Sequence, residues 1–151
     1  MRRSDRAVTD KKEIEGILAR AQVLYLGISD EDAPYTIPVC FGCEEDTLYV
    51  HSAPAGAKID LMRTDPRVGF AAHADLAIAA GETACDFTAS AASVVGRGTA
   101  RIVEDAKERI RGLNAIMRHY GAAQPTYRQE SLARTCVIAI DIDSIRGKRV
   151  G

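Results

Sequence analysis

Apolar residues recur along the chain with two periods, one typical of helices and one typical of strands. Between Ile14 and Ala21 they occupy the i, i+3, i+4 and i+7 positions of one helix face, and Asp10 before them is a favourable N-cap. The segment 105–121 repeats this pattern, with an aspartate at its start and a glycine at its end. The pattern predicts two helices that each bury one face.

Apolar runs of strand length lie between and after these helices, and turn residues bound most of them. The predicted strands are 23–28, 35–41, 47–53, 67–73, 85–89, 93–103 and 136–142. We expect hairpins between the first two strands and between the second and third. The alanine-rich segment 74–80 is predicted to be a loop, and 124–134 a loop or one helical turn. Six or so strands with helices at the start, two-thirds through and near the end indicate a small β-barrel covered by helices.

The segment 36–60 carries the chemistry on which a functional hypothesis can rest. Two strand-like runs are joined by the acidic turn 44–46, and the second run ends in His51 and Ser52. A helix is predicted over 56–64, ending before the aspartate–proline pair at 65–66, with Lys58 in its first turn. A hydroxyl, backbone amides and an ammonium at a helix N-terminus can hold a phosphate. Lysine at the positive end of the helix dipole favours an anionic partner, and a solvated surface lysine is the alternative.

Pro38 lies within the second predicted strand. Because proline donates no ladder hydrogen bond, it is confined to an edge strand or a bulge. Two interpretations stay open. The strand is a plain sheet edge, or the backbone around Ile37, Pro38 and Val39 is free to face a flat ligand.

The composition is that of an ordinary globular protein, with 46% hydrophobic and 27% charged residues. A length of 151 residues predicts one domain over 1–151. The net charge of -1 gives no reason to expect nucleic acid or an anionic membrane as partner. No apolar segment follows the basic start at Arg2 and Arg3, and no apolar run reaches transmembrane length. We therefore expect a cytoplasmic protein.

Four cysteines, Cys40, Cys43, Cys85 and Cys136, are spread through apolar runs. In a reducing compartment they are most simply small buried apolar residues. The first two form a Cys-x-x-Cys pair, but a zinc site wants a second pair at similar spacing, and strand positions three apart point to opposite faces. We expect no metal.

Several motifs, in this order along nearly the whole chain, resemble those of a known family. They are Pro34-Tyr35 with Pro38 and Phe41-Gly42, Leu48-Tyr49 with His51-Ser52-Ala53, Gly56 with Lys58-Ile59-Asp60, and Asp65-Pro66-Arg67-Val68. The set resembles the pyridoxamine 5′-phosphate oxidase-related FMN-binding proteins. The nitroimidazole-resistance (Nim-like) branch is similar in further motifs, which are Cys85, Ser93-Val94 with Gly96-Arg97-Gly98, and Ile116-Met117 with His119-Tyr120.

The resemblance implies a mainly β fold with helices, an FMN-binding split β-barrel of about six strands, and a homodimer with FMN at the subunit interface. It implies that one strand lies along the isoalloxazine ring, formed by Thr36, Ile37, Pro38, Val39, Cys40 and Phe41. Ser52 and Lys58 would hold the phosphate, with His51 beside them or facing the flavin. Ser93 and Val94 would reach the flavin from the partner subunit.

Two departures from the family pattern bear on cofactor affinity. The family usually has Arg-Lys after the glycine, whereas Ala57-Lys58 leaves one phosphate cation missing. An aromatic and a charged residue usually precede Ser93, where this chain has Ala91-Ala92. A charged contact to phosphate contributes roughly 1.5–3 kcal/mol, so the loss of one weakens FMN binding about ten- to a hundredfold. We expect Ala57→Arg to strengthen it.

His51 is the candidate catalytic proton donor, because histidine titrates near neutrality, and packing against the cofactor is the alternative role. No Ser/His/Asp or paired-carboxylate constellation stands out, so a hydrolase is unsupported. Two functions from different classes remain. One is an FMN-dependent oxidoreductase that reduces a small organic acceptor such as a nitroaromatic compound. The other is a flavin- or heme-binding module without turnover, for storage or sensing.

Overall fold

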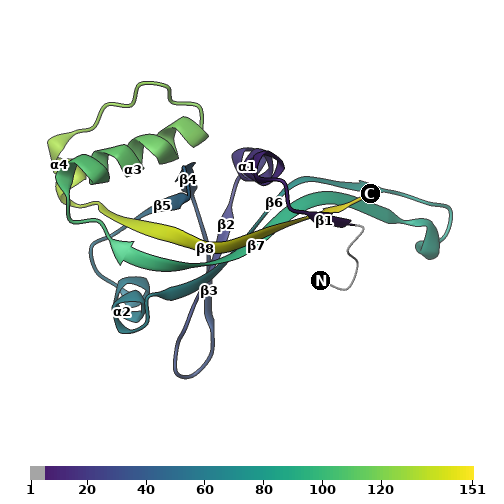
Figure 1. The fold of residues 1–151 in the computed structure, drawn as a ribbon, viewed down its shortest axis with the longest axis horizontal. Coiled ribbons are helices and arrows are strands. Elements are labelled where there is room, and N and C mark those ends of the chain that lie inside the picture. Colours follow the sequence, from purple (N-terminus) through teal and green to yellow (C-terminus); the bar gives the residue numbers. More distant parts are fainter. Residues whose placement is uncertain (1–5) are drawn as a thin grey trace.

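The computed structural model describes residues 6–151 as a long antiparallel sheet with helices against its faces and a two-stranded extension at one end (Figure 1). The helices are α1 (Lys11–Arg20), α2 (Ala57–Thr64), α3 (Ala106–His119) and α4 (Gln129–Ala133), with a 3-10 turn at Ala84–Asp86. The strands are β1 (Ala7–Val8), β2 (Leu24–Ile28), β3 (Tyr35–Val39), β4 (Phe41–Glu44), β5 (Thr47–Ser52), β6 (Arg67–Ala79), β7 (Thr88–Ile102) and β8 (Cys136–Val150). Among residues 6–151, no helix has both the length and the apolar character needed to cross a membrane.

The sheet curls until its two edge strands meet without pairing. Its strand order is β3-β2-β6-β7-β8-β5-β4, and β1 pairs separately with β8. β3 ends at Val39 and β4 begins at Phe41, so Cys40 alone connects the two ends of this order. Since one extended residue spans only about 3.3 Å, the two edges must approach each other there. No ladder joins β3 to β4 in the described part of the chain. The predicted split barrel is confirmed.

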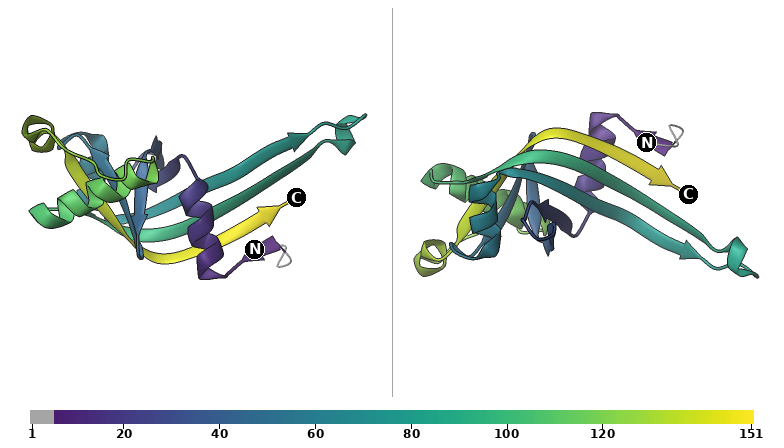
Figure 2. Two further views of the ribbon diagram at one scale, coloured as in Figure 1. Left: turned by 90° about the horizontal axis from the view of Figure 1, so that it is seen from above. Right: turned by 90° about the horizontal axis from the view of Figure 1, so that it is seen from below.

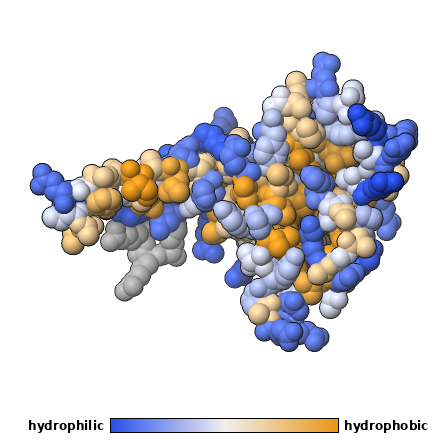
Figure 3. All heavy atoms as spheres, turned by 180° about the vertical axis from the view of Figure 1, so that it is seen from behind, coloured by the Kyte–Doolittle hydropathy of each residue, from blue (hydrophilic) through white to orange (hydrophobic). Residues whose placement is uncertain are grey.

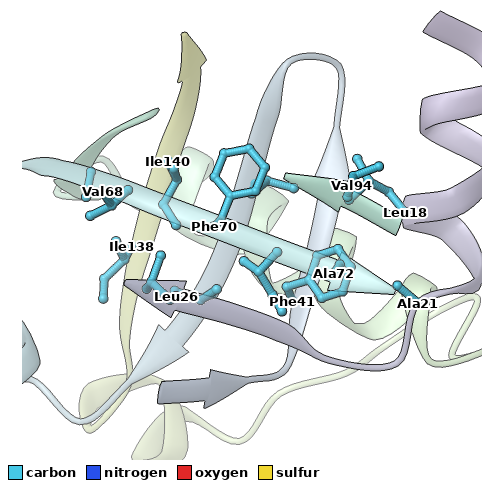
Figure 4. Packing of buried hydrophobic residues seen from close by; sticks show 14 of the residues in the cluster. Leu18, Ala21, Leu26, Phe41, Val68, Phe70, Ala72, Val94, Ile138 and Ile140 are labelled. Carbon is cyan, nitrogen blue, oxygen red and sulfur yellow. The ribbon is translucent and has the colours of Figure 1, made fainter. Parts of the chain in front are cut away.

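The interior of the barrel is filled by alternate residues of the strands. Leu26, Phe70 and Val94 point inward from neighbouring strands and are almost completely buried (Figure 4). The apolar face of α1 covers this core, and Ile17 and Leu18 are buried there as their spacing predicts. Hydrophobic burial of these side chains, at about 25 cal/mol per Å² of apolar surface, is the main force that holds the curled sheet together.

A second, smaller core lies on the opposite face of β5 and β8, under α3. Tyr49, Leu113 and Val137 are buried in it. Helices α1 and α3 begin as predicted, because Asp10 and Asp105 each accept a hydrogen bond from the backbone N–H three residues on, at 2.9 and 2.7 Å. The two cores therefore sandwich β5 and β8 between α3 and the barrel interior.

The predicted strand 35–41 is two strands, and a single hairpin between it and 47–53 is wrong. Val39 pairs with Leu24 of β2, whereas Phe41 pairs with Val50 of β5. The change of partner occurs at Cys40. The predicted hairpin between the first two strands is confirmed as β2–β3, and the acidic turn joins β4 to β5.

The β6–β7 hairpin is longer than predicted and extends beyond the barrel as an arm, residues 75–90 (Figure 2). The loop predicted over 74–80 is wrong, because β6 continues to Ala79 after an irregularity in the pairing. The strand predicted over 85–89 is wrong at its start, where Thr83 and Asp86 cap a 3-10 turn reciprocally. Exposed apolar side chains lie along the arm, and Figure 3 shows apolar surface there.

β8 is also longer than the predicted 136–142, since it pairs with β7 as far as Val150. Its last part alternates between two faces. Arg149 faces α1 and pairs with Glu13 at 2.8 Å, and a Cβ added at Gly147 would meet Val8 on that same face. Lys148, between them, points to the outer face of the sheet.

Candidate functional site

The crossover at Cys40, the end of β5 and the start of α2 meet at one end of the barrel. Phe41 lies opposite Val50, which brings Cys40 to the level of His51. Ser52 ends β5, and the connection 53–56 leads directly into α2. One chain therefore brings together Cys40, His51 and Ser52 with the first turn of α2.

The N-terminus of α2 has no side-chain cap. Gly56 holds the N-cap position at φ +126°, a backbone conformation that favours glycine. Its carbonyl accepts from the N–H groups of Ile59 and Asp60, at 2.9 and 3.2 Å. The N–H groups of Ala57 and Lys58 have no hydrogen-bond partner within residues 6–151. Such amides at a helix start can bind an anion.

The phosphate-binding groups predicted from the sequence fit this geometry. The Lys58 side chain is partly buried in the first turn of α2 and forms no hydrogen bond or ion pair within the described chain. The Ser52 hydroxyl likewise has no partner among these residues. An ammonium, a hydroxyl and two unpaired amides are complementary to a phosphate group. Within residues 6–151, no carboxylate forms an ion pair with the Lys58 ammonium.

Further positive charge surrounds the end of β5. Ser52 lies opposite Cys136 at the start of β8. Burial raises the pKa of the Cys136 thiol, and the positive charges of Arg63, Lys58 and Arg109 oppose this. The sequence alone indicates no role for Arg63 or Arg109, because no local motif links α2 or α3 to the start of β8.

The β3 residues are divided between two faces. Thr36 and Pro38 are exposed, whereas Ile37 and Val39 are partly buried against the barrel core. β3 is the first strand of the sheet order, so the edge position predicted for Pro38 is confirmed. That the backbone around Pro38 faces a flat ligand stays a prediction.

Phe41 and Val94 point into the core, with exposed fractions of 0% and 1%. Any contact of these two residues with a ligand would therefore involve their backbone. The Phe41 ring packs against His119, with ring centroids 4.5 Å apart. Side chains at these positions shape the barrel interior.

The Tyr120 hydroxyl ties the crossover to the end of α1. It accepts a hydrogen bond from the N–H of Phe41 at 3.2 Å and donates one to the carbonyl of Gln22 at 2.8 Å. Burial raises the pKa of Tyr120, so the hydroxyl keeps its proton near neutral pH. The connection that joins the two edges of the sheet is thus held in place by a side chain just beyond α3.

Ser93 lies far from Ser52 within one chain. Along β8, Ser52 is opposite Cys136 and Ser93 is opposite Lys148. The interval of 12 residues (148 − 136) corresponds to about 40 Å of strand at about 3.3 Å per residue. Figure 1 shows β8 running from the side of α4 to the far end marked C. The structure does not bring Ser93 and Val94 to the Ser52 region of the same chain.

The outer face of the sheet around Ser93 is partly apolar. A cavity of about 300 Å³ is lined by Ser93, Val95, Arg146, Gly147 and Lys148. Next to it on the same face, the rings of Tyr25 and His73 stack with centroids 6.1 Å apart. Val95 is 55% exposed.

A cavity of about 460 Å³ lies between α1, the β4–β5 turn and α3, and none of the predicted site residues lines it. Glu15, Glu45 and Arg118 line it together with Cys43. Burial raises the pKa of the Cys43 thiol to about 11, so this group is neutral at pH 7.

The cysteines are less buried than predicted. Cys40 and Cys85 are exposed, and Cys43 and Cys136 are partly buried. All four are free thiols. Within residues 6–151, no group of three or more histidine, cysteine, aspartate or glutamate side chains is arranged to hold a metal ion.

A family model described as "Pyridoxamine 5′-phosphate oxidase" matches residues 10–149. The chain belongs to this family. The chain is similar in structure to a candidate 5-nitroimidazole antibiotic resistance protein from Bacteroides thetaiotaomicron VPI-5482. The two sequences are 31% identical, and the TM-score is 0.84. The alignment covers 95% of this chain and 86% of that protein. The resemblance inferred from the motifs is confirmed.

More distant structures share the family fold. The FAD and heme binding protein from Mycobacterium smegmatis has a TM-score of 0.83 at 16% identity, over 96% of this chain and 73% of that one. The flavocytochrome Anf3 from Azotobacter vinelandii has a TM-score of 0.80 at 18% identity, over 96% and 69%. Among curated sequences, RA0666 of Rhizobium meliloti (strain 1021) is 34% identical over 61 residues, which are 40% of this chain and 40% of that protein.

Proposed function

We propose that this member of the pyridoxamine 5′-phosphate oxidase family binds FMN and is an oxidoreductase that reduces a small organic acceptor, such as a nitroaromatic compound. The observation that carries the proposal is the set of unpaired phosphate-binding groups at the end of β5, formed by Ser52, Lys58 and the first amides of α2. The similarity to the candidate nitroimidazole-resistance protein supports the acceptor class.

The phosphate of FMN lies at the start of α2 in this proposal. Lys58 neutralises part of its charge, the Ser52 hydroxyl donates a hydrogen bond, and the N–H groups of Ala57 and Lys58 donate two more. The positive end of the helix dipole adds to the attraction. A phosphate also explains why a lysine lies in a helical turn that is unfavourable for a cation.

The flavin ring lies along the crossover and the edge strand β3. The exposed residues there are Thr36, Pro38 and Cys40, and β3 leaves one row of backbone groups unpaired. When bound, the flavin supplies the electron-transfer chemistry, and the protein orients it and controls its surroundings. His51 is exposed at the level of Cys40, where its imidazole can give a proton to an acceptor as electrons arrive.

A homodimer completes the site in this proposal. Ser93 and Val94 contact the flavin from the partner subunit, because about 40 Å of strand separates them from Ser52 in their own chain. The partly apolar outer face around Tyr25, His73 and Val95 supplies the surface that the second copy buries. Light scattering at micromolar concentration should give twice the chain mass of 16.3 kDa, and the monomer mass would exclude this arrangement.

Flavin titration of the Lys58→Met variant tests the phosphate site. The substitution keeps the length of the stem and removes the charge, so FMN affinity should fall roughly tenfold or more. Riboflavin lacks the phosphate and should bind both proteins alike. Equal losses for the two ligands, or no loss for either, would contradict the phosphate assignment.

The absorption spectrum of the purified protein tests the reaction. A yellow protein that is bleached by NADPH and reoxidised by a nitroimidazole is the expected result. A Soret band would instead indicate heme, and bound flavin that no donor reduces would indicate a binding module without turnover.

A further inference from the structure

We propose that the arm, residues 75–90, holds two copies of this chain together by packing its outer face on the barrel of the second copy. The assignment rests on the homodimer proposed above and names the element that binds the partner. Three large apolar residues of the arm, Leu76, Ile78 and Phe87, have exposed fractions of 60%, 63% and 54%. Figure 3 shows this apolar surface along the arm.

The arm receives no support from its own barrel beyond Ala91. That residue pairs with Val150 near the end of β8, and in the part of the chain that the structure describes, β6 and β7 pair only with each other from there outward. Figure 2 shows the two strands continuing past the barrel. A two-stranded hairpin alone is only marginally stable in water. A surface from another molecule would therefore stabilise the arm.

A β-bulge marks the base of the arm. Two residues of β6, Asp75 and Leu76, lie opposite Ala91 alone. Asp75 has a φ of +58°, which is uncommon for a residue other than glycine. Arg20 of α1 holds its carboxylate, with hydrogen bonds from Nε at 3.1 Å and from Nη2 at 2.9 Å. The bulge is thus tied to a helix of the barrel.

This bulge changes the face on which β6 carries its apolar side chains. Ala74, before it, points into the barrel core. Beyond it, Ile78 pairs with Ala89, which by alternation along β7 lies on the same face as Ser93. Leu76, two residues before Ile78, shares that face, because one extra residue moves every following side chain to the other side. The outer face of a sheet open to water is normally polar, whereas here it is apolar.

The apolar face of the arm is continuous with the surface that the second copy buries in the proposed dimer. A cavity of about 200 Å³ is lined by Leu76 together with Tyr25 and His73 of that surface. In a two-fold dimer the same pair of surfaces meets twice, so each arm reaches from its own barrel across that of the other copy. The arm and the outer face of the barrel therefore form one interface.

The outer face of the barrel has a shape that can receive an arm. Gly27 and Gly69 lie opposite each other on β2 and β6. Both face outward, since their neighbours Leu26 and Phe70 point into the core. A Cβ added at either glycine would meet no atom nearer than 3.6 Å. This part of the sheet is a flat strip without side chains, to which another backbone can come close.

The charge of the arm favours the second copy over an anionic membrane. Residues 75–90 contain Asp75, Glu82 and Asp86 and no lysine or arginine, so an anionic surface repels them. The outer face of the barrel carries Arg97 and Arg146, which are exposed and form no ion pair within the described chain. An acidic arm and a basic sheet face are complementary.

Two double variants of β6 test the interface with the same number of new serines. Leu76→Ser with Ile78→Ser changes the outer face, and Ala77→Ser with Ala79→Ser changes the opposite face of the same segment. Sedimentation velocity over a dilution series should show the dimer dissociation constant rising about tenfold or more in the first and less than about threefold in the second. Equal changes in the two, or no change in the first, would overturn the proposal. If the first variant fails to fold by circular dichroism, Ile78→Ser alone replaces it, with a rise of about threefold or more.

Photocrosslinking of the full chain identifies the partner directly. A benzophenone amino acid in place of Ile78 should link two chains, and one in place of Ala77 should not. A crosslinked dimer from neither position, with dimerisation unchanged in the serine variants, would assign the arm to a different partner. A wild-type protein of monomer mass would refute the proposed dimer and the role of the arm together. A wild-type dimer that binds no FMN would refute the flavin proposal and leave the arm assignment standing.

Discussion

Removal of the Tyr120 hydroxyl tests whether the crossover between the two sheet edges is held by side-chain hydrogen bonds. Tyr120→Phe deletes one oxygen and leaves the ring in place. The N–H of Phe41 then loses its acceptor at 3.2 Å, and the carbonyl of Gln22 loses its donor at 2.8 Å. The first loss is the more serious, since Phe41 is completely buried whereas Gln22 is exposed and can bind water.

The expected cost follows from this difference in burial. An unpaired buried N–H costs about 1–3 kcal/mol, and the exposed carbonyl costs close to nothing once water replaces the tyrosine. We expect a total of about 2 kcal/mol. For a chain of this size, 1 kcal/mol lowers Tm by about 2–4 °C, so the variant should melt about 4–8 °C below the wild type.

Thermal and urea unfolding of Tyr120→Phe and Tyr35→Phe measure this effect. Tyr35 is partly buried and forms no hydrogen bond through its hydroxyl within residues 6–151, so its variant controls for the loss of a phenol oxygen. Hydrogen exchange of the Phe41 amide should accelerate only in Tyr120→Phe. Equal Tm values for the two variants, with unchanged exchange at Phe41, would show that the hydroxyl does not hold the crossover.

Two further substitutions test the packing of α3. The Arg101 guanidinium lowers the pKa of Glu108, so their pairing stabilises the fold above about pH 4.5 and is lost as pH falls through the lower folded-state pKa. Glu108→Gln should therefore destabilise by about 1 kcal/mol at pH 7, with a smaller difference below about pH 4 in urea unfolding, and a pH-independent difference would contradict this. A Cβ at Gly42 would lie 2.3 Å from the backbone of Ala115, so Gly42→Ala should cost about 1–3 kcal/mol or more in the same assay, and an unchanged midpoint would refute the close approach.

The parts of the fold that depend on local pattern could be predicted from the sequence. Helices α1 and α3 are examples, because the N-cap residues Asp10 and Asp105 and the helical spacing of apolar residues lie within one short segment each. The partner change at Cys40 could not be predicted in this way. It depends on Val39 pairing with Leu24 and on Phe41 filling the barrel, which are contacts between distant segments.

The candidate site shows the same division. Ser52, at the end of β5, and Lys58, in the first turn of α2, belong to one continuous stretch, so this strand–helix junction could be predicted from the sequence. The effect of the Arg109 charge on Cys136 could not, because it depends on how α3, some 50 residues further along the chain, packs against the sheet. The full lengths of β6 and β8 could not be predicted either. Their last residues are small or charged and pair with β7 without an apolar core on both faces, so they lack the apolar pattern typical of a strand.

β5 lies between β4 and β8 in the sheet, so a newly made chain can complete the proposed phosphate site only after β8 has been synthesised. β4 is adjacent to β5 in the sequence, but the first residue of β8 follows Ser52 by 84 residues (136 − 52). A two-stranded hairpin alone is only marginally stable in water. At about 5–20 residues per second, a ribosome needs about 4–17 s to supply the missing strand. His51 and Ser52 thus stay on an unsupported hairpin through much of translation, while β2, β3, β6 and β7 can already pair.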